Sequence, residues 1–102
     1  MQVIDVASDG LEGVLKAEVL QPDLILLDIG LPKLNGIEAA RRIRKVAPDS
    51  KIIFLTQESS AEVVETALSL GARGYVLKED AERDLLAALE AVILGRTFVS
   101  ST

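Results

Sequence analysis

The feature that most constrains the fold is the aliphatic run Leu-Ile-Leu-Leu at residues 24–27, which is followed at once by Asp28. Consecutive aliphatic residues without polar alternation are typical of a strand buried on both faces, as in a parallel sheet. A carboxylate directly after such a strand must lie at the strand's end, where solvent, a cation or a ligand can reach it. Gly30 and Pro32 then predict a stiff loop whose backbone can approach a ligand closely. Asp28 is therefore the first candidate site residue.

Strand-like and helix-like segments alternate along the whole chain. The strand-like runs are residues 2–7, 24–28, 51–56 and 74–78, and a segment with helical periodicity follows each of them. Pro22 and Pro48 each end a predicted helix. Four β–α units in series with short connections predict an α/β fold, in which helices pack on a parallel sheet.

The apolar residues of each helical segment predict which side of the helix is buried. The predicted inward-facing sets are Leu11, Leu15 and Val19; Ile37, Ala40, Ile43 and Ala47; Val64, Ala67 and Leu68; and Leu86, Leu89 and Ile93. The predicted helix caps are Ser8 or Asp9, Asn35, Ser59 or Ser60, and Asp80 at the amino-terminal ends, with Gly71 and Gly95 at carboxyl-terminal ends.

Composition excludes several classes of function. The chain has 102 residues, which predicts one domain over residues 1–102. A net charge of −5 and only 3% aromatic residues argue against direct nucleic-acid binding, which needs a basic footprint and stacking platforms. The absence of cysteine excludes disulfides and thiolate chemistry, and the absence of histidine removes the commonest general base. No apolar stretch reaches the length of a membrane span, so we expect a cytoplasmic protein.

Three different polar groups end three successive predicted strands. Asp28 ends the second strand, Thr56 the third and Lys78 the fourth. Ligands bind at the carboxyl ends of strands in open α/β sheets, so we expect these groups to converge. The set suits phosphoryl transfer to a carboxylate, with Asp28 as nucleophile, Thr56 as a hydrogen-bond donor and Lys78 as a point cation. Taken singly, the same residues also fit a turn residue, a strand former and a solvated lysine.

Several motifs together resemble the receiver domain of bacterial two-component response regulators, in the subgroup that usually carries a DNA-binding helix-turn-helix output. They are ASDG, PDLILLDIGLPKLNGIEAARRIR, KIIFLT, GARGYVLKED and GRTFVS, and they span essentially the whole chain. The resemblance implies a flavodoxin-like, doubly wound parallel sheet, with Asp28 as phosphoacceptor and Thr56 and Lys78 as its partners. It also implies a sensor histidine kinase as phosphodonor, a backbone carbonyl of Gly30 as Mg²⁺ ligand and Tyr75 as a switch residue. It implies no enzyme in the ordinary sense.

The chain departs from the family at its start. In the family a first strand, which ends in the acidic pair that binds Mg²⁺, and a first helix precede the segment that residues 2–7 resemble. We therefore expect a sheet truncated to four β–α units, without the central strand of the usual 2-1-3-4-5 order. Asp5 and Glu58 are poorly placed to replace the acidic pair. Asp28 and Gly30 alone should hold Mg²⁺ weakly, so phosphorylation should be impaired.

Two other readings remain open. An enzyme of the haloacid-dehalogenase type also uses a strand-end aspartate, but it needs a second carboxylate two residues later, where this chain has Gly30. The stronger rival is a non-catalytic oligomerisation or interaction module derived from a receiver domain.

The departure at the start of the chain also predicts self-association. We expect the first strand to pair directly with residues 24–28 in a four-stranded sheet, which exposes either Ile25 and Leu27 or Leu24 and Leu26. Exposed apolar surface of this kind predicts a homodimer or a higher oligomer.

Overall fold

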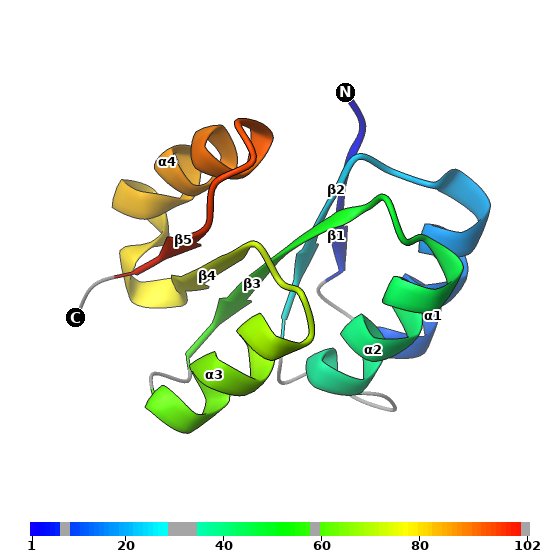
Figure 1. Ribbon diagram of the computed structural model, residues 1–102, viewed down its shortest axis with the longest axis horizontal. Helices are drawn as coiled ribbons and strands as arrows, with labels where there is room; N and C mark the ends of the chain where they lie inside the picture. The colour runs from blue at the N-terminus through cyan, green and yellow to red at the C-terminus, as the bar shows by residue number, and fades with distance from the viewer. Residues whose placement is uncertain (7–8, 29–34, 58–59, 101–102) are drawn as a thin grey trace.

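The computed structural model describes residues 1–6, 9–28, 35–57 and 60–100 (Figure 1). The strands are β1 (Val3–Val6), β2 (Leu24–Leu27), β3 (Lys51–Thr56), β4 (Gly74–Leu77) and β5 (Phe98–Val99). The helices are α1 (Gly10–Leu20), α2 (Gly36–Val46), α3 (Ala61–Ser69) and α4 (Ala81–Ile93), and the 3₁₀ helix η1 (Lys78–Asp80) precedes α4. The predicted succession of β–α units is therefore confirmed.

The strands form one parallel sheet in the order β1-β2-β3-β4-β5. Direct pairing of β1 with β2 was predicted and is confirmed, with Val3 opposite Leu24. The prediction of four strands is wrong, because Phe98 and Val99 pair with Gly74 and Tyr75 and add a fifth. This strand is too short to stand out as a pattern of alternation in the sequence.

Helices cover both faces of the sheet (Figure 1). On one face, α1, α2 and α3 pack over the side chains of Ile25, Leu27, Ile52, Phe54, Tyr75 and Leu77. On the other face, Ala88 and Val92 of α4 pack over Leu24, Ile53 and Val76. The alternation of neighbouring residues between the two clusters explains why the strands are continuously apolar.

Helix ends follow the predicted capping chemistry. The side chains of Asp9, Asn35 and Ser60 accept hydrogen bonds from the first-turn amides of α1, α2 and α3, at 2.9, 3.0 and 3.2 Å. Gly71 and Gly95 have φ angles of +89° and +82°, as the predicted left-handed helix ends require. Asp80 does precede α4, but its side chain makes no capping bond and instead pairs with Arg83.

Two of the predicted inward faces are wrong. Leu11, Leu15 and Val19 of α1 are 43%, 58% and 79% exposed. In their place, α1 buries Gly10, Gly13, Val14 and Ala17. Leu86 and Ile93 of α4 are likewise exposed and Ala88 and Val92 are buried, whereas Leu89, the third predicted residue, is partly buried and packs against the core. The buried side of α1 carries mostly small residues, which allow a short approach, so its larger apolar residues lie outside. The predicted faces of α2 and α3 are confirmed, with Ala40, Ile43, Ala47 and Ala67 fully buried.

The predicted exposure of β2 is also wrong. Ile25, Leu27 and Leu24 are at most 1% exposed, and Leu26 is half-buried. Leu24 belongs to the cluster that α4 covers, which explains its burial. Among the described residues, the large apolar side chains that reach water therefore lie mainly on or next to α1 and α4, and the others are Met1, Val3 and Val99.

Candidate functional site

The three predicted site residues lie at the carboxyl ends of neighbouring parallel strands. Asp28 directly follows β2, Thr56 is the last residue of β3, and Lys78 directly follows β4. Parallel pairing of β2 with β3 and of β3 with β4 brings these ends to the same edge of the sheet. This edge is where ligands bind in open α/β sheets.

An ion pair joins two of the predicted residues across the sheet edge. Lys78 Nζ donates a hydrogen bond to Asp28 Oδ2, although fifty positions separate the residues in the chain. The Asp28 side chain is 20% exposed and that of Lys78 is 40% exposed. The pair is therefore reachable by a small phosphodonor, and the ammonium already lies where negative charge would accumulate on a phosphorylated Asp28.

Thr56 shares a surface pocket with Lys78. The pocket has a volume of about 450 Å³ and is lined by Thr56, Gln57, Leu77, Lys78 and Glu79. Thr56 is itself only 2% exposed. Lys78 thus contacts the Asp28 carboxylate and lines the same pocket as Thr56.

Tyr75 lies on β4, two residues before Leu77, and is 1% exposed. Its ring packs against that of Phe54, with the centroids 6.4 Å apart and the planes tilted by 55°. The side chain therefore belongs to the core under α1, α2 and α3. Gly30 and Pro32, the remaining predicted site residues, lie outside the described residues.

A Mg²⁺ ion at this edge would need oxygen ligands around Asp28. Among residues 1–6, 9–28, 35–57 and 60–100, no group of three or more His, Cys, Asp or Glu side chains could hold a metal ion. Asp28 already bonds Lys78, and Asp5 is exposed in the middle of β1. Mg²⁺ demands near-octahedral oxygen ligation. The described residues therefore do not make a Mg²⁺ site.

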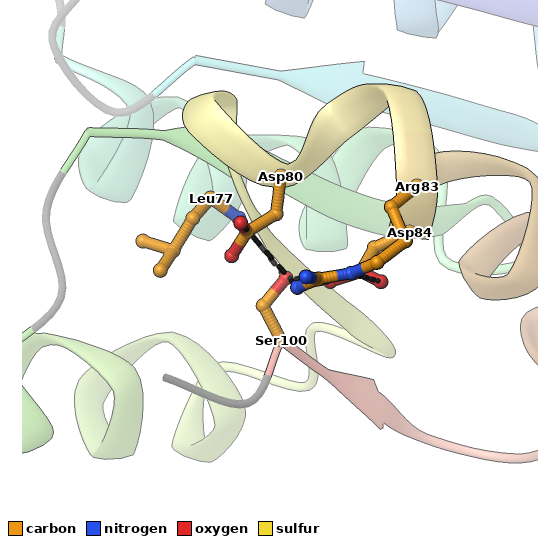
Figure 2. Close-up of polar contacts among 5 residues, drawn as sticks. All are labelled: Leu77, Asp80, Arg83, Asp84 and Ser100. Atoms are coloured by element: carbon orange, nitrogen blue, oxygen red, sulfur yellow. Dashed lines mark hydrogen bonds and ion pairs between the residues drawn. The ribbon is translucent and has the colours of Figure 1, made fainter.

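A polar network beside the site was not predicted from the sequence (Figure 2). Ser100, which follows β5, is 8% exposed, and its Oγ accepts a hydrogen bond from the Leu77 backbone N–H at 3.2 Å. The same hydroxyl donates to Asp84 Oδ2 at 3.2 Å. Arg83 donates to Asp84 at 3.0 Å and also pairs with Asp80 at 3.3 Å. The only sequence signal is the run of charges in residues 78–84, which equally fits a solvated helix start.

The network also shifts the pKa values of Asp84 and Arg83. The hydrogen bond from Arg83 holds the pKa of the Asp84 carboxyl below its usual value, and the hydrogen bond from Ser100 acts in the same direction. Asp84 raises the pKa of Arg83 in turn. Asp84 is therefore fixed in its charged, acceptor-only form at neutral pH.

Comparison with known proteins identifies the family. The family described as the response regulator receiver domain matches residues 1–90. The chain belongs to the response regulator receiver family. Receiver domains of this family are phosphorylated by sensor histidine kinases and generally use Mg²⁺.

A curated relative of this receiver domain agrees with the family match. The nitrate/nitrite response regulator protein NarL of Escherichia coli (strain K12) is 40% identical over 98 residues, which cover 96% of this chain and 45% of NarL. The chain therefore spans less than half of this relative's length.

Solved structures give the same answer. A LuxR-family two-component response regulator from Aurantimonas sp. SI85-9A1 is 33% identical with a TM-score of 0.84, covering 90% of this chain and 66% of that one. The response regulator domain of Thermotoga maritima CheB is 35% identical with a TM-score of 0.74, covering 84% and 69%. The predicted flavodoxin-like α/β fold is thus confirmed.

Among the described residues, none of the helices has the length and apolar character that are needed to cross a bilayer.

Proposed function

We propose that residues 1–102 form a phosphoacceptor receiver module, in which Asp28 accepts a phosphoryl group from a sensor histidine kinase. The observation that carries this proposal is the ion pair between Asp28 and Lys78 at the carboxyl edge of the sheet. A strand-end carboxylate next to a fixed cation is suited to phosphoryl transfer, because catalysis of this reaction depends on positioning and charge stabilisation.

The proposed transfer assigns one role to each residue. A carboxylate oxygen of Asp28 attacks the phosphorus of the donor phosphohistidine; a P–O bond forms and the P–N bond breaks, leaving an acyl phosphate and a histidine. Lys78 offsets the negative charge on the phosphoryl oxygens, and the Thr56 hydroxyl donates a hydrogen bond to one of them. Tyr75 is the proposed switch residue, whose ring would change rotamer after phosphorylation.

Magnesium binding is proposed to be weak and phosphorylation correspondingly impaired. The expected ligands are Asp28 and the backbone carbonyl of Gly30, and among the described residues no group of three or more His, Cys, Asp or Glu side chains could hold a metal ion. Lys78 then carries most of the charge stabilisation. The chain is proposed to act in the cytoplasm, to bind no nucleic acid itself and to have no other enzymatic activity.

Self-association is proposed from the apolar side chains that reach water. Leu15, Val19, Leu86 and Leu94 are 58–79% exposed, and they lie on or directly after α1 and α4. Burying apolar surface contributes about 25 cal/mol per Å². We propose a homodimer or higher oligomer, so thermal stability should rise with protein concentration. Light scattering that finds a folded monomer at micromolar concentration would refute this part of the proposal.

A second candidate function is a non-catalytic interaction module derived from a receiver domain. The exposed apolar residues of α1 and α4 and the incomplete set of metal ligands favour it. Under this alternative, the Asp28–Lys78 pair is a remnant without phosphoryl chemistry.

The proposal is tested by labelling with acetyl phosphate in the presence of Mg²⁺, followed by intact-mass measurement. We expect the wild-type chain to gain one phosphoryl group slowly and Asp28→Asn to gain none, because the amide cannot attack phosphorus. Asp23→Asn is the matched control, since Asp23 precedes β2 at the opposite end of the same strand. Equal labelling of the Asp28→Asn variant would show that Asp28 is not the acceptor.

A further inference from the structure

A chain of polar contacts links Leu77, directly before Lys78, to Asp80, two residues after it (Figure 2). Leu77 N–H donates to Ser100 Oγ, Ser100 donates to Asp84, Arg83 donates to Asp84, and Arg83 pairs with Asp80. Leu77 immediately precedes Lys78, and Asp80 lies two residues after it in η1. The backbone that carries Lys78 is thus held on both sides by one network.

Ser100 is the member of this network that joins distant parts of the sequence, since its partners are Leu77 and Asp84. Its backbone N–H donates to the Tyr75 carbonyl at 2.8 Å and so continues the pairing between β4 and β5 beyond Val99. Two residues further along β4, the Leu77 backbone N–H donates to the Ser100 hydroxyl. Leu77 is only 3% exposed, so without the hydroxyl its amide would face a site with little access to water.

Asp84 fixes the direction of the Ser100 hydroxyl. A carboxylate only accepts hydrogen bonds, so the Ser100 hydrogen must point toward Asp84 and a lone pair is left for Leu77 N–H. The Asp84 side chain is 13% exposed and is itself held by Arg83. The donor order therefore runs from Leu77 N–H through the Ser100 hydroxyl to Asp84, and Arg83 donates to the same carboxylate from its other side. Consecutive hydrogen bonds of this kind polarise and strengthen one another.

We propose that Ser100 is a positioning residue for phosphoryl transfer, which holds the Leu77–Lys78 backbone so that the Lys78 ammonium meets Asp28. The inference rests on the proposed function of Asp28. Lys78 has four flexible methylene groups, so the position of its ammonium depends on the anchoring of its backbone. Loss of the anchor should misplace the cation, and misplacement by about 1 Å can slow a positioned reaction roughly 100-fold.

The test compares Ser100→Ala with Ser50→Ala. Ser50 is 9% exposed and its hydroxyl donates to the Pro22 carbonyl at 2.6 Å, so it is another buried serine bonded to the backbone. It directly precedes β3, at the end of the sheet away from the candidate site. The control therefore loses a comparable hydrogen bond without touching Lys78.

The first readout is the rate of Asp28 labelling by acetyl phosphate at a temperature at which both variants remain folded by circular dichroism. We expect the labelling rate of Ser100→Ala to be lower than that of wild type by on the order of tenfold or more, as misplacement of a catalytic group predicts. Ser50→Ala should label at the wild-type rate. The Ser100→Ala effect should vanish in a Lys78→Ala background, because the cation that it positions is gone. Equal rates in Ser100→Ala and Ser50→Ala, or an undiminished effect without Lys78, would overturn the inference.

A second readout separates this inference from the proposed function. In NMR spectra, Asp28→Asn should shift the Lys78 side-chain signals when it is made in the wild-type chain or in the Ser50→Ala variant. The same substitution made in the Ser100→Ala variant should shift them much less, because Lys78 no longer meets Asp28 there. Absence of labelling in the wild-type chain would refute phosphoacceptance by Asp28 while this comparison still tests Ser100. An unchanged response in Ser100→Ala would refute the positioning role in either case.

Discussion

The ion pair between Asp28 and Lys78 should contribute little to folding and much to phosphoryl transfer. The side chains are 20% and 40% exposed, so water screens their attraction. Exposed pairs of this kind couple with about 0.2–1 kcal/mol, whereas breaking a buried pair costs about 3–5 kcal/mol. We expect a coupling energy near the upper end of the first range, about 1 kcal/mol, because Asp28 is the more buried partner.

The assay is a double-mutant cycle with Asp28→Asn, Lys78→Gln and the combined variant. Unfolding by urea is followed by circular dichroism, since the chain has no tryptophan and a single tyrosine. The coupling should shrink when the salt concentration is raised from about 0.1 M to about 1 M, because the screening length falls from about 10 Å to about 3 Å. The control pair is Lys16 with Glu12 on α1, at 3.2 Å and about equally exposed at 53% and 54%.

Labelling of Lys78→Gln completes this prediction. Removing one preorganised donor that stabilises charge developing in a transition state typically costs about 100–1000-fold in rate. We expect Lys78→Gln to slow acetyl phosphate labelling by at least about tenfold, and Lys16→Gln to leave it unchanged. A coupling energy above about 3 kcal/mol together with unchanged labelling would show that Lys78 is a structural residue.

Three further outcomes are expected. Gly71→Ala should lower the free energy of unfolding by about 2–3 kcal/mol in urea titrations, because the φ of +89° at this position is strained for alanine. The new Cβ would also lie 1.3 Å from the Arg44 side chain and displace it from its hydrogen bond to the Leu70 carbonyl. Gly95 has a φ of +82° but open space around it, so Gly95→Ala should lower the free energy of unfolding by only about 1–2 kcal/mol. Equal losses in the two variants would refute the contribution of Arg44. The pKa of Asp84 is lowered in the folded state, so its contribution to stability is present above the unfolded pKa of about 3.9 and is lost as the pH falls through the folded value. The stability advantage of wild type over Asp84→Asn should therefore shrink below about pH 4 in acid titrations, and a constant difference would contradict this assignment. Calorimetry should show weak Mg²⁺ binding, and tight stoichiometric binding would mean that a ligand lies beyond the described carboxylates.

The sequence predicted the parts of the fold that depend on local pattern. The aliphatic run at residues 24–27 and the polar groups after three strands placed Asp28, Thr56 and Lys78 at one sheet edge, and the structure brings Lys78 into contact with Asp28. Capping by Asp9, Asn35 and Ser60 followed from side-chain chemistry that acts within a few residues.

The remaining features depend on packing between distant segments. Periodicity placed Leu11, Leu15 and Val19 inside, but the choice between two neighbouring helix faces was decided by close approach through Gly13 and Ala17. Ser100 could not be linked to Leu77 from the sequence, because that contact needs β5 to pair with β4. Short strands such as Phe98–Val99 gain their stability from a neighbour rather than from their own pattern.

A titration with beryllofluoride, followed by NMR of backbone and side-chain signals, tests the central claim most directly. Beryllofluoride mimics a phosphoryl group on a carboxylate, so a receiver site should respond without turnover. We predict shifts concentrated at Asp28, Thr56, Lys78 and Tyr75 in the wild-type chain and their loss in Asp28→Asn. A flat response in the folded wild-type chain would contradict the phosphoacceptor assignment and would leave the interaction module as the better account.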